Sequence, residues 1–590
     1  MKELLSLNKY IFKYKYRLIL GFIFIFLSNL FTVIAAKYVG KAINFISIAI
    51  TNYKNSAVNF EEYKSQLINY GLIIVGLPLI SGFFRYLMRQ TIIVTSRLIE
   101  FDLRNDIYSQ YQKLSISFYK KNKVGDLMNR ITEDILNVRM YLGPGIMYVV
   151  DLVVLFGITF FQMLSESKNL TLFALIPLPF LSILIFAVSG RINKRSKKVQ
   201  EVQSEISSYV QDIFSGIRII KSFSNEAIIK EEYINKSEKY KEKSMHLVKT
   251  EAVFFPLMIL TVGLSHTLIL FMGGYFYFNG TINNIGTIAQ FFLYINMLIW
   301  PFTALGWVSS IVQRASASQK RINEFLLEEP EIKNLNLENS VIEGKIEFKN
   351  VSFTYENTGI QALKNVSFVI EKGKTLAILG KTGSGKTTIL ELIARLYDID
   401  EGEILIDDKP IKEINLSDLR NSIGFVPQEN FLFSDSIQNN ISFGKFNSTK
   451  EEVIGIAKKA SIDDNIVRFK DQYDTLIGER GVTLSGGQKQ RISIARAMIK
   501  ESEILIFDDS LSALDTETEE KILSELISFT KNKTTIIVTH RISSAKNTDF
   551  ILVLENGKVI ETGNHDILIN KKSYYLDIYN KQLSEKKIHN

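Results

Sequence analysis

The chain contains no cysteine among its 590 residues. Neither a disulfide framework nor a thiolate metal site is therefore available to it. The N-terminus also lacks the pattern of a cleavable secretory signal, because Lys2, Lys9 and Lys13 are interspersed with apolar residues there. The net charge is +8, but no clear basic patch stands out in the C-terminal part. We therefore expect no nucleic-acid partner.

Charge is also missing from several long apolar stretches. A charge-free run of about 20 residues is long enough to cross a bilayer as a helix. The turn cluster at 278–284 divides the longest run into two parts. The sequence therefore predicts six membrane-spanning helices. The runs lie at 18–36, 65–84, 140–165 with the single charge of Asp151, 169–190 and 252–313.

Lysine and arginine gather on one side of these predicted spans. The connections 85–139 and 191–251 are dense in basic residues, whereas the tips at 166–169 and 278–284 carry few charges or none. Cytoplasmic loops carry this excess of positive charge. We expect the N-terminus, both long connections and everything beyond residue 320 to be cytoplasmic.

The order of the predicted elements indicates two domains of different class. Residues 1–16 are expected to form an amphipathic elbow helix on the inner membrane face. Residues 17–326 are expected to form an all-α transmembrane domain with six helices. A polar linker at 327–344 leads to 345–590, where strand and helix patterns alternate. The fold class is therefore multidomain, with a helical transmembrane domain followed by an α/β domain.

The two long basic connections are too helical in pattern to be simple loops. We expect them to continue the membrane helices into the cytoplasm. Each is expected to turn back through a short perpendicular piece, one at 118–126 and the other at 215–226. These pieces are the candidate coupling regions of the transmembrane domain.

A phosphate-loop motif lies near the start of the α/β domain. The run GKTGSGKT at 380–387 follows an apolar segment at 375–379 and precedes a helical one at 388–395. Its glycines let backbone N–H groups approach phosphates at a helix N-terminus. Lys386 adds a positive charge, and the Thr387 hydroxyl suits Mg²⁺. The chain is thus predicted to bind ATP or a related triphosphate. The candidate residues are Gly380, Lys381, Thr382, Gly383, Ser384, Gly385, Lys386, Thr387 and Thr388.

Two further segments suit the same chemistry. The apolar strand 504–508 ends in Asp508, a carboxylate placed to hold Mg²⁺ across from Thr387. A Gly-rich segment opens the helix that continues over 489–498, and its free N–H groups attract an anion. A second anion site suggests that ATP is shared between two domains. The residues of this segment are Leu484, Ser485, Gly486, Gly487 and Gln488.

Together these motifs resemble the ATPase cassette of ATP-binding cassette (ABC) transporters, whose signature segment 484–488 matches. Six spans fused ahead of one such cassette resemble a half-size ABC exporter. The segment 475–481 is similar to the exporters' cross-domain contact loop. The resemblance implies an α/β P-loop ABC ATPase domain and a dimer with a second half-transporter. It also implies a multi-pass protein among the lipids of a bacterial inner membrane, with both termini and the ATPase domain in the cytoplasm.

The resemblance also implies roles for individual residues. Tyr355 would stack on adenine, although a strand aromatic can also serve a small core. Gln428 would touch Mg²⁺ and the attacking water. His540 would sense the γ-phosphate, although a lone histidine is often a structural donor. The stretch 431–441 resembles the surface that receives the coupling helices. The implied cross-domain residues are Glu479, Arg480 and Asp515, and the implied metal set is Thr387, Gln428 and Asp508.

Asp509 departs from the family pattern, which places glutamate after the metal aspartate as the catalytic base. Aspartate is one methylene shorter, so its carboxylate falls short by about 1.5 Å. A misplacement near 1 Å can cost about a hundredfold in rate. Asp509 therefore predicts a slow site of the kind found in one half of heterodimeric exporters. A homodimer with modest turnover stays open, because Tyr355, Gln428 and His540 are all present.

The spans also hold candidates for cargo contact. Ionisable residues inside a membrane are functional candidates, although a plain hydrogen bond is the favoured interpretation for Asp151 and for His266. Aromatic residues of the last two spans suit either an adaptable amphipathic site or ordinary packing. They are Phe271, Tyr275, Tyr277, Trp300 and Trp307.

The leading hypothesis is ATP-driven export of small hydrophobic or amphipathic compounds, either drugs or lipids. A second hypothesis is a nucleotide-gated or regulatory membrane subunit that hydrolyses little ATP, as Asp509 would allow. A third is a peptide exporter, although no cysteine protease domain precedes the first span.

Overall fold

The computed structural model describes residues 2–54, 60–478, 481, 484–510, 525–526, 528–571 and 574–589. The chain divides into two compact units. The first comprises Met1–Gln112 and Val124–Glu328, and the second comprises Lys113–Lys123 and Glu329–Asn590. The short segment Lys113–Lys123 thus groups with the C-terminal unit, although its neighbours in sequence belong to the first.

The described part of the first unit is helical throughout, which agrees with the all-α prediction. Its helices are η1 (Lys2–Leu7), α1 (Asn8–Lys13), α2 (Lys15–Lys54), α3 (Phe60–Lys113), α5 (Val124–Asn129), η2 (Arg130–Asp134), α6 (Ile135–Met140), η3 (Tyr141–Gly145), α7 (Ile146–Glu166), α8 (Lys168–Leu175), α9 (Pro177–Ser215), α10 (Ile217–Phe223), α11 (Glu226–Phe278) and α12 (Gly286–Leu326).

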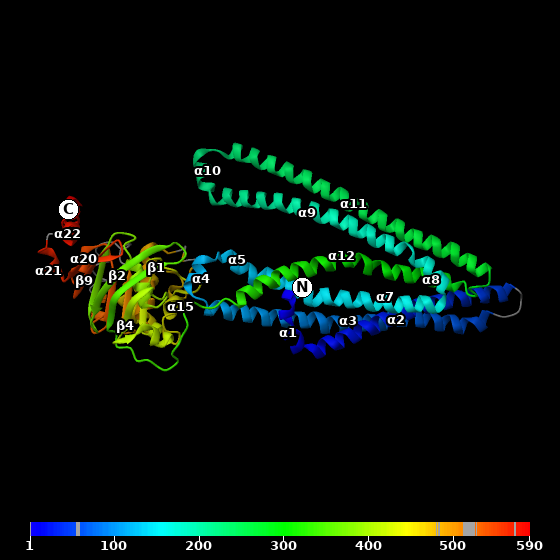
Figure 1. The fold of residues 1–590 in the computed structure, drawn as a ribbon, viewed down its shortest axis with the longest axis horizontal. Coiled ribbons are helices and arrows are strands. Elements are labelled where there is room, and N and C mark those ends of the chain that lie inside the picture. The colour runs from blue at the N-terminus through cyan, green and yellow to red at the C-terminus, as the bar shows by residue number, and fades with distance from the viewer. Residues whose placement is uncertain are drawn as a thin grey trace. The chain divides into compact units, whose positions relative to one another are not determined.

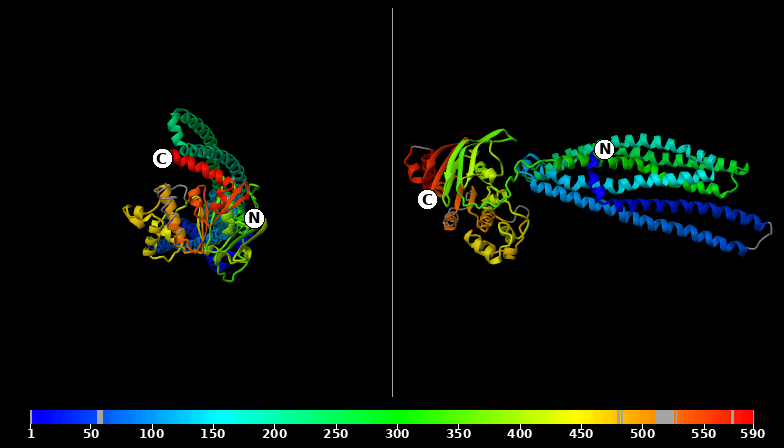
Figure 2. Two further views of the ribbon diagram at one scale, coloured as in Figure 1. Left: turned by 90° about the vertical axis from the view of Figure 1, so that its left-hand side faces the viewer. Right: turned by 60° about the horizontal axis from the view of Figure 1, so that its bottom comes forward.

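The long helices of this unit pack as neighbours. Helices α2 and α3 run side by side (Figure 2), and the Ser28 hydroxyl donates to the Ser81 carbonyl at 3.1 Å. Helices α9 and α11 also run side by side and are joined by α10 (Figure 1). No residue of α10 is buried, and Phe223 is 72% exposed. The predicted turn-back piece at 215–226 is therefore a short helix with an uncovered surface.

Five helices in the described part are long and apolar enough to cross a membrane. The remaining predicted span, 169–190, falls on α8 and the start of α9, and some of its side chains lie outside the described residues. Pro177 lacks the N–H that a continuous helix would use, which explains the break between α8 and α9. The six-span count stays a prediction. The five helices are Lys15–Asn52, Tyr63–Lys113, Val124–Glu166, Glu226–Phe278 and Gly286–Leu326.

A pair of glycines brings α2 and α12 into close contact. A Cβ atom on Gly286 would overlap the carbonyl oxygen of Gly40, and a Cβ on Gly40 would lie 2.9 Å from the carbonyl oxygen of Gly286. Small residues allow membrane helices to approach in this way. The contact lies beside an apolar cluster that includes Val33, Phe291 and Tyr294.

The second unit is built on two sheets. One has the order β2-β1-β4-β5 and the other has the order β10-β9-β3-β8-β7-β6. In the second sheet β9, β3, β8, β7 and β6 pair in parallel, and β10 pairs antiparallel to β9. The strands are β1 (Ile346–Tyr355), β2 (Ile360–Ile370), β3 (Thr375–Gly380), β4 (Glu401–Ile406), β5 (Lys409–Pro410), β6 (Ile423–Val426), β7 (Ile504–Asp508), β8 (Thr534–Val538), β9 (Phe550–Glu555) and β10 (Lys558–Gly563).

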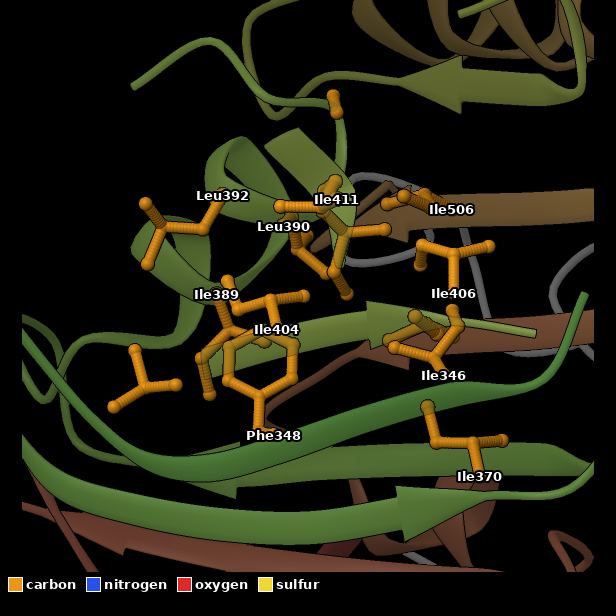
Figure 3. Packing of buried hydrophobic residues seen from close by; sticks show 14 of the residues in the cluster. Ile346, Phe348, Ile370, Ile389, Leu390, Leu392, Ile404, Ile406, Ile411 and Ile506 are labelled. Carbon is orange, nitrogen blue, oxygen red and sulfur yellow. The ribbon is translucent and has the colours of Figure 1, made fainter. Parts of the chain in front are cut away.

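Helices complete this α/β unit. An apolar cluster packs α13 between the two sheets, and Figure 3 shows Phe348, Ile389 and Ile506 within it. A second cluster joins α15, α16 and α18 to β6 and β7 and forms a helical lobe. The described helices are α4 (Ile116–Lys121), α13 (Lys386–Ile393), η4 (Ile411–Glu413), α14 (Leu416–Asn421), α15 (Ile437–Ser442), α16 (Lys450–Lys459), α17 (Asp463–Ile466), η5 (Gln472–Asp474), α18 (Gly486–Met498), α20 (Ile542–Ala545), α21 (His565–Ile569) and α22 (Tyr574–His589).

Candidate nucleotide site

The parallel register brings three chemically important strand ends to one edge of the larger sheet. Ile378 of β3 lies beside Val538 of β8, and Val538 lies beside Asp508 of β7. The phosphate loop begins where β3 ends, and His540 follows β8 by two residues. Ligands of open α/β sheets bind at the carboxyl ends of the strands. The predicted site residues from these three strands therefore converge.

The loop between β3 and α13 is shaped for close approach to an anion. Gly385 adopts φ +103° just before α13, and a Cβ atom there would lie 2.5 Å from the Ala362 carbonyl oxygen. Only glycine fits such a position. The Lys386 ammonium folds over the loop and donates to the carbonyls of Gly380 and Lys381, each at 2.9 Å. The residues from 380 to 388 thus form one compact cradle.

Lys386 is 7% exposed. Burial lowers the pKa of its ammonium, while the negative charges of Asp509 and Asp508 act in the opposite direction. A buried positive charge whose hydrogen bonds go to neutral carbonyl oxygens favours an anionic ligand that would compensate it. The cradle therefore suits phosphate groups.

Thr387 and Asp508 form the oxygen pair predicted for a metal. The Thr387 hydroxyl lies 2.9 Å and 3.2 Å from the two carboxylate oxygens of Asp508. Burial and the nearby charge of Asp509 raise the pKa of Asp508. Magnesium binds through few carboxylates and completes its shell with phosphates and water. Within the described residues no group of three His, Cys, Asp or Glu could hold a metal. The Thr387 hydroxyl and the Asp508 carboxylate are oxygen donors of the kind that such a shared shell uses.

Tyr355 at the end of β1 is tied to the phosphate-loop helix. Its hydroxyl donates to Glu391 at 2.8 Å and lies 3.0 Å from the Thr388 hydroxyl. Tyr397 meets the Tyr355 ring edge-on at 5.5 Å. A cavity of about 150 Å³ opens beside Tyr355, Tyr397 and Glu356. Glu391 and Tyr397 were not among the sequence candidates. The spacing of Glu391 three residues after Thr388, on one face of a helix, was the available signal.

The short helix α4, which belongs to the second unit, reaches the same place. The Lys120 ammonium lies over the Tyr355 ring at 5.4 Å and over the Tyr397 ring at 5.1 Å. It also pairs with Glu391 at 3.4 Å. A cation above two aromatic faces is favourable. Lys120, one residue of the predicted coupling region 118–126, therefore contacts Tyr355, Tyr397 and Glu391 within the second unit.

Asp509 and His540 lie at the same sheet edge. Asp509 adopts φ +44°, and its backbone N–H donates to the Val538 carbonyl at 3.0 Å. Burial and the positive charge of Lys386 lower the pKa of His540, while Asp509 acts in the opposite direction. The charges of Lys386 and Asp509 therefore both act on the pKa of His540. Gln428 follows β6, the outermost parallel strand, and its side chain is exposed.

The signature segment lies in the helical lobe. Ser485 caps α18 by accepting from the Gln488 N–H at 3.3 Å, and the Gln488 side chain accepts from the Ser485 N–H at 3.0 Å. This reciprocal pair is a capping box. Gly486 and Gly487 form the first turn of the helix. Leu484 packs in the lobe's apolar cluster, whereas α13 belongs to the other cluster.

Other sequence candidates have simpler surroundings or lie outside the described residues. Asp151 accepts from the Asn29 amide at 2.8 Å, which is a hydrogen bond between α7 and α2. His266 stacks on Phe292 at 4.6 Å. Trp307 meets Tyr148 edge-on at 5.4 Å. The residues outside the described part are Glu479, Arg480 and Asp515.

Both units of the chain match known protein families. Residues 18–302 match the ABC transporter transmembrane region, and residues 363–512 match the family described as ABC transporter. The Multidrug resistance-like ATP-binding protein MdlA of Escherichia coli (strain K12) is 36% identical over 521 residues, which cover 88% of each chain. The ATP-dependent lipid A-core flippase of Syntrophus aciditrophicus (strain SB) is 33% identical over 523 residues, which cover 88% of this chain and 86% of the flippase.

A solved structure of a bacterial Atm1-family ABC exporter with ATP bound covers 98% of both chains, with a TM-score of 0.77 and 25% identity. The protein is therefore a multi-pass protein of the inner membrane with a cytoplasmic ATPase domain, and it works with a second half-transporter in ATP-driven export. Its fused transmembrane region and ATPase domain show that the chain belongs to the ABC transporter family and is a half-size ABC exporter.

Proposed function

We propose that the chain uses ATP to export hydrophobic or amphipathic compounds, either drugs or lipids, by alternating access. The main support is the position of Lys386, Thr387 and Asp508, which lie together at one edge of the larger sheet. The same chain has several helices that are long and apolar enough to cross a membrane. Relatives named for multidrug resistance and for lipid A-core transport support the class of cargo.

The triphosphate is proposed to lie in the cradle 380–388, with Lys386 turning from the loop carbonyls to the phosphates. Adenine would stack on Tyr355 beside the adjoining cavity. Magnesium, held by Thr387, Asp508 and Gln428, would neutralise phosphate charge. His540 would contact the γ-phosphate, and Asp509 would orient the attacking water.

Each ATP is proposed to bind between two cassettes. The phosphate loop and the signature helix belong to different apolar clusters of this chain, so one chain's cradle would be completed by segment 484–488 of the second half-transporter. Glu479, Arg480 and Asp515 would lie at this junction. Closure of the cassettes would move the membrane helices through the segments 118–126 and 215–226 and would turn the cavity outward.

Asp509 favours a heterodimer with one slow and one fast site. Its carboxylate stands about 1.5 Å short of the glutamate position, and a general base contributes about 10²–10⁴ to a rate. The intact signature of this chain would complete the fast site on the partner's phosphate loop. Purification from the native membrane with mass spectrometry tests this, because recovery of this chain alone would establish a homodimer.

Asp509 also supports a second candidate, a nucleotide-gated membrane subunit that binds ATP with little hydrolysis. A peptide exporter is the third candidate, and large apolar side chains exposed in the helices fit all three. Transport into inside-out vesicles separates the pump from the nucleotide-gated subunit. A pump accumulates labelled amphiphile only with ATP, loses uptake with vanadate and loses it in Lys386→Ala. Uptake that is indifferent to both would remove the pump proposal.

A further inference from the structure

The side-chain amide of Gln582 joins the C-terminal helix α22 to the segment around His540. Its nitrogen donates to the His540 carbonyl at 2.7 Å, and its oxygen accepts from the Ile542 N–H at 2.9 Å. The two partners fix the orientation of the amide, because a carbonyl only accepts and an N–H only donates. The Gln582 side chain thus forms hydrogen bonds with the residue before Arg541 and with the residue after it.

The segment that Gln582 holds is a short turn at the sheet edge. His540 follows β8, and α20 begins at Ile542. The first N–H groups of a helix have no partner within the helix, so Gln582 supplies one from outside. Thr539 supplies another contact by accepting from the Arg541 N–H at 3.0 Å. The backbone position of His540 therefore depends on residues on both sides.

Helix α22 is itself firmly anchored. The Glu561 carboxylate accepts from the N–H groups of Tyr574 and Tyr575 at 2.7 Å and 3.2 Å. Tyr575 is fully buried, and its hydroxyl lies 2.6 Å from Nδ1 of His565. The apolar cluster around Tyr575 includes Ile542. Gln582 therefore lies on a helix that is packed and hydrogen-bonded against the rest of the second unit.

The opposite end of the same helix reaches the phosphate loop. The Lys381 ammonium lies over the Tyr574 ring at 5.7 Å and 3.8 Å from Glu555. Lys381 is the second residue of the cradle, and His540 follows the neighbouring strand. Helix α22 thus touches both sides of the candidate nucleotide site.

We infer that Gln582 is a positioning residue for ATP hydrolysis, which holds the His540 backbone so that the imidazole meets the γ-phosphate. The inference rests on the proposed role of His540 and extends the site to a helix outside the family motifs. Gln582 itself touches neither phosphate nor water. Its loss should leave ATP binding intact and should lower turnover, because the cradle keeps its own contacts.

The test compares three variants of the full-length dimer in lipid nanodiscs. Gln582→Met keeps the side-chain length and removes both hydrogen bonds. Gln582→Glu can still accept from Ile542 but cannot donate to His540 when ionised. Leu583→Ala, at an exposed neighbouring position, is the matched control. We expect kcat at this chain's own site, resolved as its own phase of phosphate release in a single turnover, to fall about tenfold in the Met and Glu variants, as the loss of one hydrogen bond allows, with KM changed less than twofold.

Hydrogen exchange of the peptide that contains Ile542 gives a second readout. Exchange should accelerate in Gln582→Met and stay slow in Gln582→Glu, so a fall in kcat in the Glu variant identifies the bond to His540. Wild-type kcat in Gln582→Met, or an equal loss in Leu583→Ala, would overturn the inference. His540→Ala separates the two proposals, because unchanged turnover in that variant would instead refute the role of His540.

Discussion

The Thr387 hydroxyl lies 2.9 Å from a carboxylate oxygen of Asp508, although 121 residues separate the two in sequence. The contact connects the first turn of α13 with the end of β7. Burial, and also the charge of Asp509, raises the pKa of the Asp508 carboxyl, whereas the hydrogen bond from Thr387 lowers it. Burial of this carboxylate therefore costs the nucleotide-free protein some stability.

The raised pKa of Asp508 predicts how the stability of Asp508→Asn depends on pH. An acid whose pKa is raised on folding binds more protons in the folded state, so stability falls as pH rises through the window between the ordinary and the raised pKa. We expect the variant to be more stable than the wild type at pH 7 without nucleotide, and the difference should shrink as pH falls through that window. Thermal unfolding at several pH values measures it.

The same variant should lose the stabilisation that Mg²⁺ and ATP give to the wild type. A matched Asp418→Asn change, in a carboxylate that accepts from the Ser340 N–H and is not among the candidate nucleotide or metal residues, should keep that stabilisation. If Asp508→Asn kept it as well, Asp508 would not be a metal ligand.

A change of Asp509 to Glu should accelerate hydrolysis at this chain's own site. The added methylene restores the reach of the carboxylate, and a correction of about 1.5 Å corresponds to a gain of about a hundredfold. Phosphate release in a single turnover by the purified dimer measures the rate. Asp509→Asn, which removes the carboxylate, should not accelerate it. An unchanged rate in Asp509→Glu would mean that the length of the side chain does not limit the reaction.

Replacement of Tyr355 separates stacking from hydrogen bonding. Tyr355→Phe keeps the ring and loses the bonds to Glu391 and Thr388. Tyr355→Ala also loses the stack, which is worth about 1–3 kcal/mol, so ATP should bind about tenfold to a hundredfold more weakly. Inorganic triphosphate, which has no base, serves as the control ligand in calorimetry. Equal weakening of both ligands in Tyr355→Ala would argue against stacking.

The contact between α2 and α12 predicts the effect of one added methyl group. Gly286→Ala places a Cβ against the Gly40 carbonyl, and such overpacking costs about 1–3 kcal/mol. Gly274→Ala is the control, because a Cβ there would meet nothing within 4 Å. Thermal unfolding in nanodiscs should show a loss only for Gly286→Ala. Equal behaviour of the two variants would mean that the helices separate easily.

Much of the candidate site was predictable because its motifs are local. The cradle 380–388 and the cap of α18 each depend on residues a few positions apart, which share one turn and one helix start. Asp508 was predictable for a related reason, since the end of a buried parallel strand defines its place. The contact of Lys120 with Tyr355 was not predictable, because Lys120 comes from a segment more than two hundred residues earlier.

The order of the membrane helices and the ATPase domain, the phosphate loop and the unusual Asp509 follow from the sequence, because each of them consists of contiguous residues. Only in the folded chain do Glu391 and Lys120 lie beside Tyr355, Gly40 contact Gly286 and Gln582 bond to the His540 carbonyl. Those contacts arise when packed sheets and helices bring distant segments together. Such packing depends on the burial of many apolar side chains at once, which no short motif encodes.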